Sequence, residues 1–265
     1  MEFRRQFFGV AASLLAFSLT PALAAEPHAC AGPNDAMRLS MPLPRTSERL
    51  AKRLPLTIVA IGSSSTAGAG ASSAANCYPS RLEAELKTRF PGIPIKVINR
   101  GVNGEEIADM LKRFADGVIK EKPDLVLWQV GTNSVLRNKP LEPHTSLILE
   151  GLKQLKNIDA DVVLIDPQYA PRVIERPDAA EGMVRLIAAT AKTANVDLVQ
   201  RFEVMRWWHD HEHMEFAEFI SPDKLHMNDW GYGCLAKLIG RSIVEAATRN
   251  MASAHATAAT QVVTH

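Results

Sequence analysis

Residues 56–70 read LTIVAIGSSSTAGAG, and this stretch contains the two features that decide the fold. The apolar run Leu56–Ile61 has the length and composition of a strand that is buried on both faces. The run stops at Gly62, and small residues follow as far as Gly70. An apolar run that gives way to small residues predicts a strand ending in a tight turn before a helix.

Working outward, four more short apolar runs follow, and the segments between them have helical spacing. In one such segment Leu82, Leu86 and Phe90 recur every four residues. Strands that alternate with helices imply a parallel sheet with helices on both faces. We therefore predict a three-layer α/β/α fold with a flavodoxin-like, parallel, five-stranded sheet. The four further runs are Ile95–Ile98, Leu125–Val130, Val162–Ile165 and Val196–Val199.

The small-residue turn after the first run carries a candidate nucleophile, Ser64. Ligands bind beyond the carboxyl ends of the strands in such sheets, and a helix N-terminus there has free N–H groups for an oxyanion. Two other interpretations compete. One is a flexible Gly/Ser loop. The other is a phosphate-binding turn, although neither GxxxxGK[ST] nor GxGxxG follows the strand.

A carboxylate and a histidine lie close together near the far end of the chain, at Asp223 and His226. A serine nucleophile needs a base to take its proton, and the base needs a carboxylate to fix its tautomer. This pair precedes the amphipathic stretch Leu235–Val244 and is expected in a loop before the last helix. A DxxH pattern also occurs by chance on protein surfaces.

Two further candidates follow the second and third apolar runs, at Gly104 and Asn133. Acyl transfer needs preorganised donors for the tetrahedral oxyanion, and a glycine N–H and an asparagine amide can supply them. Both residue types are also common in ordinary turns.

These four segments resemble the signature of the SGNH (GDSL) hydrolase family, whose four blocks surround Ser, Gly, Asn and His in this order. The resemblance implies a catalytic triad of Ser64, His226 and Asp223. It also implies an oxyanion hole made by the backbone N–H groups of Ser64 and Gly104 and the side chain of Asn133.

The resemblance extends from about residue 56 to residue 244 and departs from the family at one position. Ser63 stands where the family usually has Asp immediately before the nucleophile. That Asp is not a triad member, so we expect the chemistry to survive. The neighbouring hydroxyls of Ser63 and Ser65 leave the choice of nucleophile less distinct.

The resemblance implies a serine esterase that hydrolyses carboxylic esters through an acyl-enzyme intermediate and needs no cofactor. A small-molecule or carbohydrate ester is the expected partner, and deacetylation of carbohydrate is one possibility. The triad does not separate this activity from an O-acyltransferase on envelope polysaccharide, or from a thioesterase or lysophospholipase. An intact triad argues against a binding module that has lost activity.

Two other clusters are less specific. Gln168, Tyr169 and Arg172 follow the fourth run, where they could line an acyl or alcohol pocket or simply stabilise a loop. Three histidines alternate with acidic residues over positions 209–213. Histidines can bind a metal only in a favourable turn geometry, so we interpret this segment as a solvated loop and predict no metal site.

The N-terminal residues predict export. Residues 1–25 have an arginine pair, an apolar run and a small-x-small site at Ala22–Ala24, which is typical of a cleaved signal peptide. The run is short for a membrane span, which needs about 20 residues, so this interpretation is favoured over an N-terminal anchor. We expect a periplasmic or secreted protein with no stable membrane insertion after cleavage.

We divide the rest into an extended N-terminal arm (26–55), a hydrolase domain (56–249) and a disordered tail (250–265). An oxidising compartment would permit one disulfide among Cys30, Cys77 and Cys234, and the sequence does not choose among the three pairings. Basic residues number 30 and acidic residues 29, so no excess of positive charge recruits nucleic acid.

Overall fold

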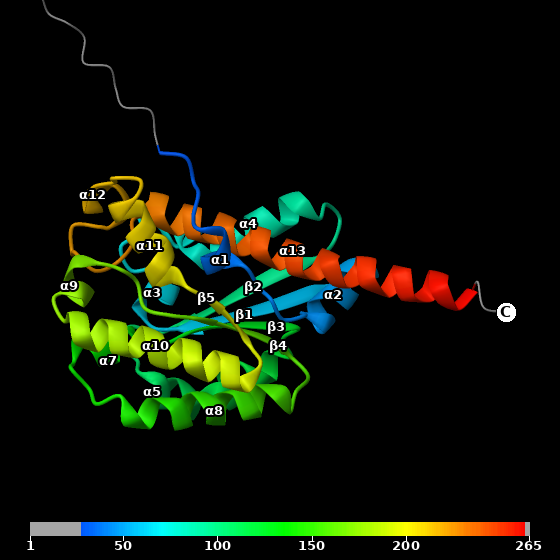
Figure 1. Ribbon diagram of the computed structural model, residues 1–265, viewed down its shortest axis with the longest axis horizontal. Coiled ribbons are helices and arrows are strands. Elements are labelled where there is room, and N and C mark those ends of the chain that lie inside the picture. The colour runs from blue at the N-terminus through cyan, green and yellow to red at the C-terminus, as the bar shows by residue number, and fades with distance from the viewer. Residues whose placement is uncertain (1–27, 263–265) are drawn as a thin grey trace, which may run out of the picture.

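A parallel sheet of five strands forms the centre of the molecule in the computed structural model, which describes residues 28–262. The strand order is β2-β1-β3-β4-β5, the order of flavodoxin-like sheets (Figure 1). Each of the five predicted apolar runs forms one strand, and the predicted α/β fold is confirmed. The strands are β1 (Leu56–Gly62), β2 (Ile95–Gly101), β3 (Leu125–Gln129), β4 (Asp161–Ile165) and β5 (Asp197–Val199).

Helices cover both faces of this sheet (Figure 1). On one face α4 (Tyr78–Arg89) packs against α13 (Asp229–Val262). On the other, α8 (Glu142–Lys156) contacts α5 (Ile107–Lys112) and α10 (Pro177–Ala194). The remaining helices are α1 (Asn34–Met37), α2 (Pro44–Ala51), α3 (Ser64–Ala67), α6 (Phe114–Gly117), α7 (Thr132–Leu136), α9 (Pro171–Ile174), α11 (Arg201–Asp210) and α12 (Phe216–Phe219), with 3₁₀ turns η1 (Ala74–Asn76) and η2 (Ile119–Glu121).

The core lies on both sides of the central strands. Every residue of β3 is buried, and so is every residue of β1 except Thr57. Side chains on both faces of these strands are therefore removed from water, which explains why the runs read as continuous rather than alternating. Burial of this apolar surface, at roughly 25 cal/mol per Å², is the main term that stabilises the sheet.

The N-terminal arm differs from its predicted extended form, because α1 and α2 lie within residues 26–55. Pro44 occupies the first turn of α2, where its missing N–H is not needed for a helical hydrogen bond. Ser47 and Leu50 are buried on the inner side of this helix. The prolines of this segment thus begin a helix rather than prevent one.

Aspartates at the starts of three strands hold the arm against the amino edge of the sheet. Asp197 accepts from the backbone N–H of Ser40 at 2.8 Å, and Asp161 accepts from that of Thr46 at 2.7 Å. Asp124, just before β3, pairs with Arg49 at 2.8 Å. Acceptors at the sheet edge thus satisfy backbone donors that the arm would otherwise leave unpaired.

A disulfide joins the arm to α13. Cys30 and Cys234 are bonded with their Cα atoms 5.3 Å apart, and Cys77 is a buried free thiol. The structure therefore selects one of the three pairings that the sequence left open.

Helix α13 continues to Val262, so most of the segment 250–265 is helical rather than disordered. This segment is rich in alanine, which is the best helix former and which a prediction from small, polar composition undervalues. The predicted signal peptide lies outside the described residues. Within 28–262 no helix is long and apolar enough to cross a membrane.

A fully buried cation lies behind the turn that follows β1. Arg201, the first residue of α11, donates from its guanidinium to Ser65 Oγ and to the backbone oxygen of Asp166, both at 3.0 Å. The Asp166 carboxylate accepts from the N–H of Phe202 at 2.9 Å. Burial raises the pKa of Asp166 to about 7, outweighing the opposite effects of the Phe202 N–H and the Arg201 charge.

Replacing both Cys30 and Cys234 with Ser should lower the free energy of unfolding by about 2–5 kcal/mol, because the disulfide closes a loop that spans 204 positions. Urea unfolding of both proteins measures the change. As a control, a reductant should shift the wild-type transition and leave that of the double variant in place. Coincident transitions for the two oxidised proteins would contradict the prediction.

Stability should also depend on pH through Asp166. Its native pKa is raised, so the stabilisation from the bound proton is fully present below about pH 4 and is lost as the pH rises through about 7. Asp166→Asn lacks this dependence. The wild type should therefore lose stability relative to the variant between pH 4 and 7, by at most roughly 4 kcal/mol. Melting temperatures across this range test the prediction, and parallel profiles would overturn it.

Candidate active site

Three side chains from distant parts of the chain meet beyond the carboxyl ends of the strands. Ser64 begins α3 directly after β1, and His226 and Asp223 lie in the loop before α13. His226 Nε2 is 2.7 Å from Ser64 Oγ, and His226 Nδ1 is 2.5 Å from Asp223 Oδ2. A hydroxyl, an imidazole and a carboxylate in line have the geometry of a nucleophile, its base and the group that orients the base.

Asp223 also builds the turn that carries the histidine. Its Oδ1 accepts from the backbone N–H groups of Leu225 and His226, each at 2.9 Å, and from Ser221 Oγ at 2.8 Å. Lys224, inside this turn, has a positive φ of 61°. Partial burial would raise the pKa of Asp223, but the hydrogen bonds from His226, Leu225 and Ser221 outweigh it and hold the pKa well below its ordinary value.

The structure separates the three neighbouring serines. The side chains of Ser63 and Ser65 are buried and point to Gln129, whose Oε1 lies 3.0 Å and 3.3 Å from their hydroxyl oxygens. The same Oε1 accepts from the backbone N–H of Ser63 at 2.8 Å. Ser64 is the serine of this turn whose hydroxyl contacts His226.

The buried network continues from Gln129 to the histidine loop. Gln129 Nε2 lies 3.5 Å from Thr132 Oγ1, which donates to Gln168 Oε1 at 3.0 Å. Gln168 Nε2 reaches the backbone oxygen of Leu225 at 3.4 Å. Gln168 is 1% exposed and both ends of its amide are used inside the protein, as expected of a residue that stabilises the loop, and a contact with substrate stays a prediction.

Two of the three predicted oxyanion donors, Gly104 and Asn133, lie close together, one in the loop after β2 and one in α7. Asn133, in α7, donates from Nδ2 to the backbone oxygen of Glu105 at 2.8 Å. Gly104, which precedes Glu105 in the chain, has a φ of +79°, a conformation that favours glycine. Arg137 donates to the Gly104 carbonyl at 2.8 Å. The amide of Asn133 has a second N–H, which this bond does not use.

The end of β2 also approaches the turn that carries Ser64 very closely. A Cβ atom on Gly101 would lie 2.0 Å from the backbone nitrogen of Ala67 in α3. Only glycine permits this contact between the end of β2 and α3, so Gly101 fixes how far apart the Ser64 turn and the Gly104 loop can lie.

The other two residues predicted to line a substrate pocket contact α12 and the histidine loop. Tyr169 stacks on Phe216 of α12, with ring centroids 5.8 Å apart, and meets Phe202 edge-on at 5.2 Å. Arg172 donates its backbone N–H to the Lys224 oxygen at 3.1 Å. The Arg172 side chain is exposed, and a role for it in substrate binding stays a prediction.

Two of the three histidines at positions 209–213 stack on different aromatic rings. His209 stacks on Phe216 at 4.3 Å, and His211 stacks on Trp207 at 4.9 Å. Among the described residues, no group of three or more His, Cys, Asp or Glu side chains is arranged to hold a metal ion.

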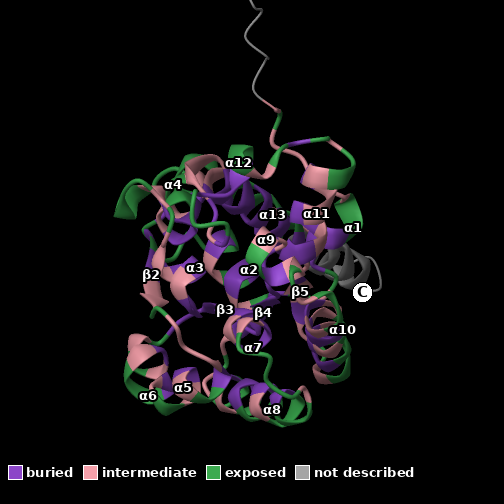
Figure 2. Ribbon diagram, turned by 90° about the vertical axis from the view of Figure 1, so that its left-hand side faces the viewer, coloured by how far each residue is buried: buried purple, intermediate pink, exposed green. Residues whose placement is uncertain are grey.

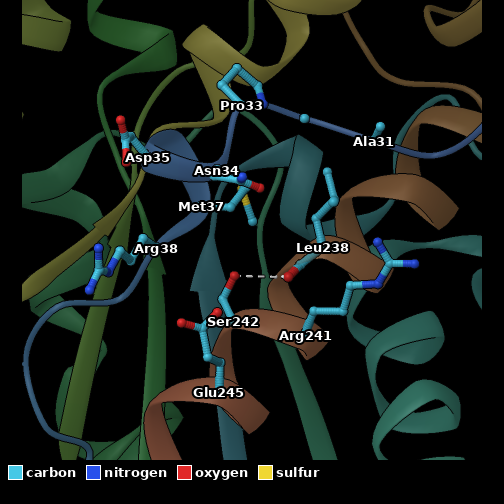
Figure 3. Close-up of a pocket in the computed structure, with 11 residues that line it drawn as sticks. Ala31, Pro33, Asn34, Asp35, Met37, Arg38, Leu238, Arg241, Ser242 and Glu245 are labelled. Atoms are coloured by element: carbon cyan, nitrogen blue, oxygen red, sulfur yellow. Dashed lines mark hydrogen bonds between the residues drawn. The ribbon is translucent and has the colours of Figure 1, made fainter. Parts of the chain in front are cut away.

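Several cavities lie along α13 and beside the histidine loop. One, of about 620 Å³, lies between the arm and α13 and is lined by Pro33, Arg38 and Arg241 among others (Figure 3). Another, of about 570 Å³, is lined by residues on both sides of Asp223 in the chain. The second therefore adjoins the candidate site.

Sequence reasoning missed the two side chains that hold the serine turn. Gln129 carried a signal, because a single polar residue interrupts the apolar run 125–130 just before Asn133. Arg201 carried none, because an arginine after an apolar run usually lies on the surface.

Comparison with known proteins places the chain among esterases of similar fold. An acetylxylan esterase of Geobacillus stearothermophilus is 27% identical over 178 residues, covering 60% of this chain and 76% of that protein. A two-domain esterase active on acetylated mannans superposes with a TM-score of 0.68 at 20% identity, covering 80% of this chain and 56% of that one. The present chain thus spans little more than half of that protein.

Acetylxylan esterase Axe2, also from Geobacillus stearothermophilus, gives a TM-score of 0.61 at 20% identity as a catalytic histidine-to-alanine mutant, covering 71% of this chain and 94% of that one. At these identities the structural likeness shows the fold. The family assignment rests on the sequence, since residues 29–249 match the Non-GDSL lipase-like family, and the chain belongs to that family.

Proposed function

We propose that this protein is an exported serine esterase that removes acyl groups, acetyl groups among them, from carbohydrate. The observation that carries the proposal is the hydrogen-bonded line from Ser64 through His226 to Asp223. The substrate class is supported by the relatives, one named an acetylxylan esterase and one described as active on acetylated mannans.

The reaction has two steps with Ser64 as nucleophile. His226 Nε2 takes the hydroxyl proton as Ser64 Oγ attacks the ester carbonyl, and it then gives that proton to the departing sugar oxygen. The acyl group is left on Ser64. His226 next takes a proton from water as the water attacks the acyl-enzyme, and it returns that proton to Ser64 Oγ when the bond to the acyl group breaks and the acid leaves. Asp223 orients the imidazole and stabilises its charged form in both steps.

The oxyanion is bound by the N–H groups of Ser64 and Gly104 and by the side chain of Asn133. The Asn133–Glu105 hydrogen bond supports this role, because it orients the amide and ties α7 to the Gly104 loop before substrate arrives. Donors that are fixed in advance need no reorganisation when charge develops, which is where such sites gain most of their effect.

This mechanism is that of SGNH hydrolases, and Ser63 does not prevent it. The position before the nucleophile is filled by a buried side chain that bonds to Gln129, not to the reacting groups. The relative Axe2 supports the choice of groups, because its catalytic mutants replace a serine, an aspartate and a histidine.

Export is supported by two independent features. Residues 1–25 have the pattern of a signal peptide, and the Cys30–Cys234 disulfide requires an oxidising compartment to persist. A periplasmic or secreted enzyme would meet polysaccharide esters directly.

Ser64→Ala should reduce the release of acetate from acetylated xylan and from p-nitrophenyl acetate by about 10⁴-fold or more, because the nucleophile is lost. Ser65→Ala is the matched control: it removes a neighbouring hydroxyl that bonds to Gln129 and Arg201, and it leaves the Ser64–His226 pair in place. A larger loss in Ser65→Ala than in Ser64→Ala would reassign the nucleophile. Activity on p-nitrophenyl acetate alone would support the esterase and refute the carbohydrate substrate.

Asn133→Ala should lower kcat by about 10²–10³ and change KM little, because its hydrogen bond gains strength only as the oxyanion forms. The variant also loses the bond to Glu105, so its melting temperature must be measured alongside. A lowered melting temperature with unchanged kcat would identify Asn133 as a turn former and remove it from the site.

A further inference from the structure

The cavity beside the histidine loop has an apolar lining. Its volume of about 570 Å³ lies within the range of ligand pockets, about 300–1,000 Å³. It lies between α9, α12 and the loop that carries Asp223. Apolar side chains supply most of the lining, and Ser221, Lys224 and Asn228 supply the rest. The apolar members are Pro171, Phe216, Ala217, Ile220 and Pro222.

This cavity shares a wall with the candidate triad. Ser221 lines it and donates to Asp223 Oδ1, while the other carboxylate oxygen of Asp223 holds His226. Figure 1 shows α9 and α12 toward the same end of the molecule as α3, which carries Ser64, and Figure 2 views the molecule from that end. A group in the cavity and an ester at Ser64 would therefore lie on the same face.

Two of the polar lining side chains are already engaged within the protein. Ser221 Oγ donates to Asp223, and Asn228 donates to the Ala217 oxygen at 3.2 Å and accepts from Gly231 N–H at 3.0 Å. A sugar ring would need free donors and acceptors for its hydroxyls, and these groups offer few. An apolar group needs none, so the lining favours an apolar occupant.

Aromatic contacts order the Phe216 side of the cavity. The ring of Phe216 stacks on those of Tyr169 and His209, at centroid distances of 5.8 Å and 4.3 Å, and these two rings also meet each other at 6.1 Å. Ile220, another lining residue, is 3% exposed. A rigid apolar wall lowers the entropic cost of binding, because little ordering is left to be done when the ligand arrives.

We propose that this cavity is a specificity subsite that binds an apolar group of the ester substrate while the ester is cleaved at Ser64. The proposal rests on the proposed esterase function. The group is either an acyl chain longer than acetyl or an apolar substituent on the alcohol side. The enzyme therefore prefers esters that carry such a group over the smallest acetyl ester.

The test compares wild type with Ala217→Trp, which fills the cavity from an exposed position on α12. Ala189→Trp, at an exposed position on α10 that does not line the cavity, is the matched control. Phe216→Ala, which removes the wall instead, is a second variant. One substrate arm lengthens the acyl chain of p-nitrophenyl esters from acetyl to hexanoyl. The other keeps acetyl and changes the alcohol from phenol to 2-naphthol, two leaving groups of similar acidity.

The readout is the ratio of kcat/KM for the larger ester to that for the smallest in each arm. In one arm the wild-type ratio should exceed about 10, since one methylene in a hydrophobic pocket can change kcat/KM about 10-fold or more. Ala217→Trp and Phe216→Ala should bring that ratio near 1 by raising KM for the larger ester, and Ala189→Trp should keep it. The arm that responds identifies the acyl or the alcohol side.

A wild-type ratio near 1 in both arms overturns the subsite, and so does a ratio that both cavity variants leave unchanged. An equal loss on every ester also overturns it, because the cavity would then not discriminate. Failure of the esterase proposal would look different, since the wild type would then cleave no ester or Ser64→Ala would remain active.

Discussion

The side-chain oxygen of Gln129 holds the turn on which the site depends. One buried Oε1 accepts the backbone N–H of Ser63 and lies within hydrogen-bond distance of the hydroxyls of Ser63 and Ser65. A buried donor left without a partner costs about 1–3 kcal/mol, so this turn is stable only with an acceptor at that point. Because two hydroxyls face inward, the hydroxyl of Ser64 is left to meet His226.

The same interaction connects parts of the sheet that are distant in sequence. Gln129 ends β3, the turn it holds follows β1, and its amide continues through Thr132 and Gln168 to the loop of His226. The buried cation of Arg201 supports the turn from the other side. The groups proposed to react are thus positioned by a network of polar side chains inside an apolar core, and such networks are rigid when their members are satisfied.

The sequence predicted the strands well, and the residues that support the candidate site poorly. The runs were visible because both faces of a central parallel strand are buried. Ser64 and His226 stood out because one follows a strand and the other precedes a helix, and their roles as reacting groups stay predictions. The inward direction of Gln168 was not visible, because position after a strand does not reveal whether a side chain points inward. The conformation of the N-terminal arm was predicted wrongly for a similar reason. Its hydrogen bonds go to Asp161 and Asp197, more than a hundred residues away, and no local pattern reports such partners.

The covalent link between Cys30 and Cys234 has a consequence for how the protein withstands proteolysis. A single cut at any exposed loop between these residues leaves two fragments that stay attached to each other. Re-pairing of the fragments is then a unimolecular event with a high effective concentration, independent of dilution. A protein built in this way can be nicked once by a protease and still migrate as one species until a reductant separates the pieces.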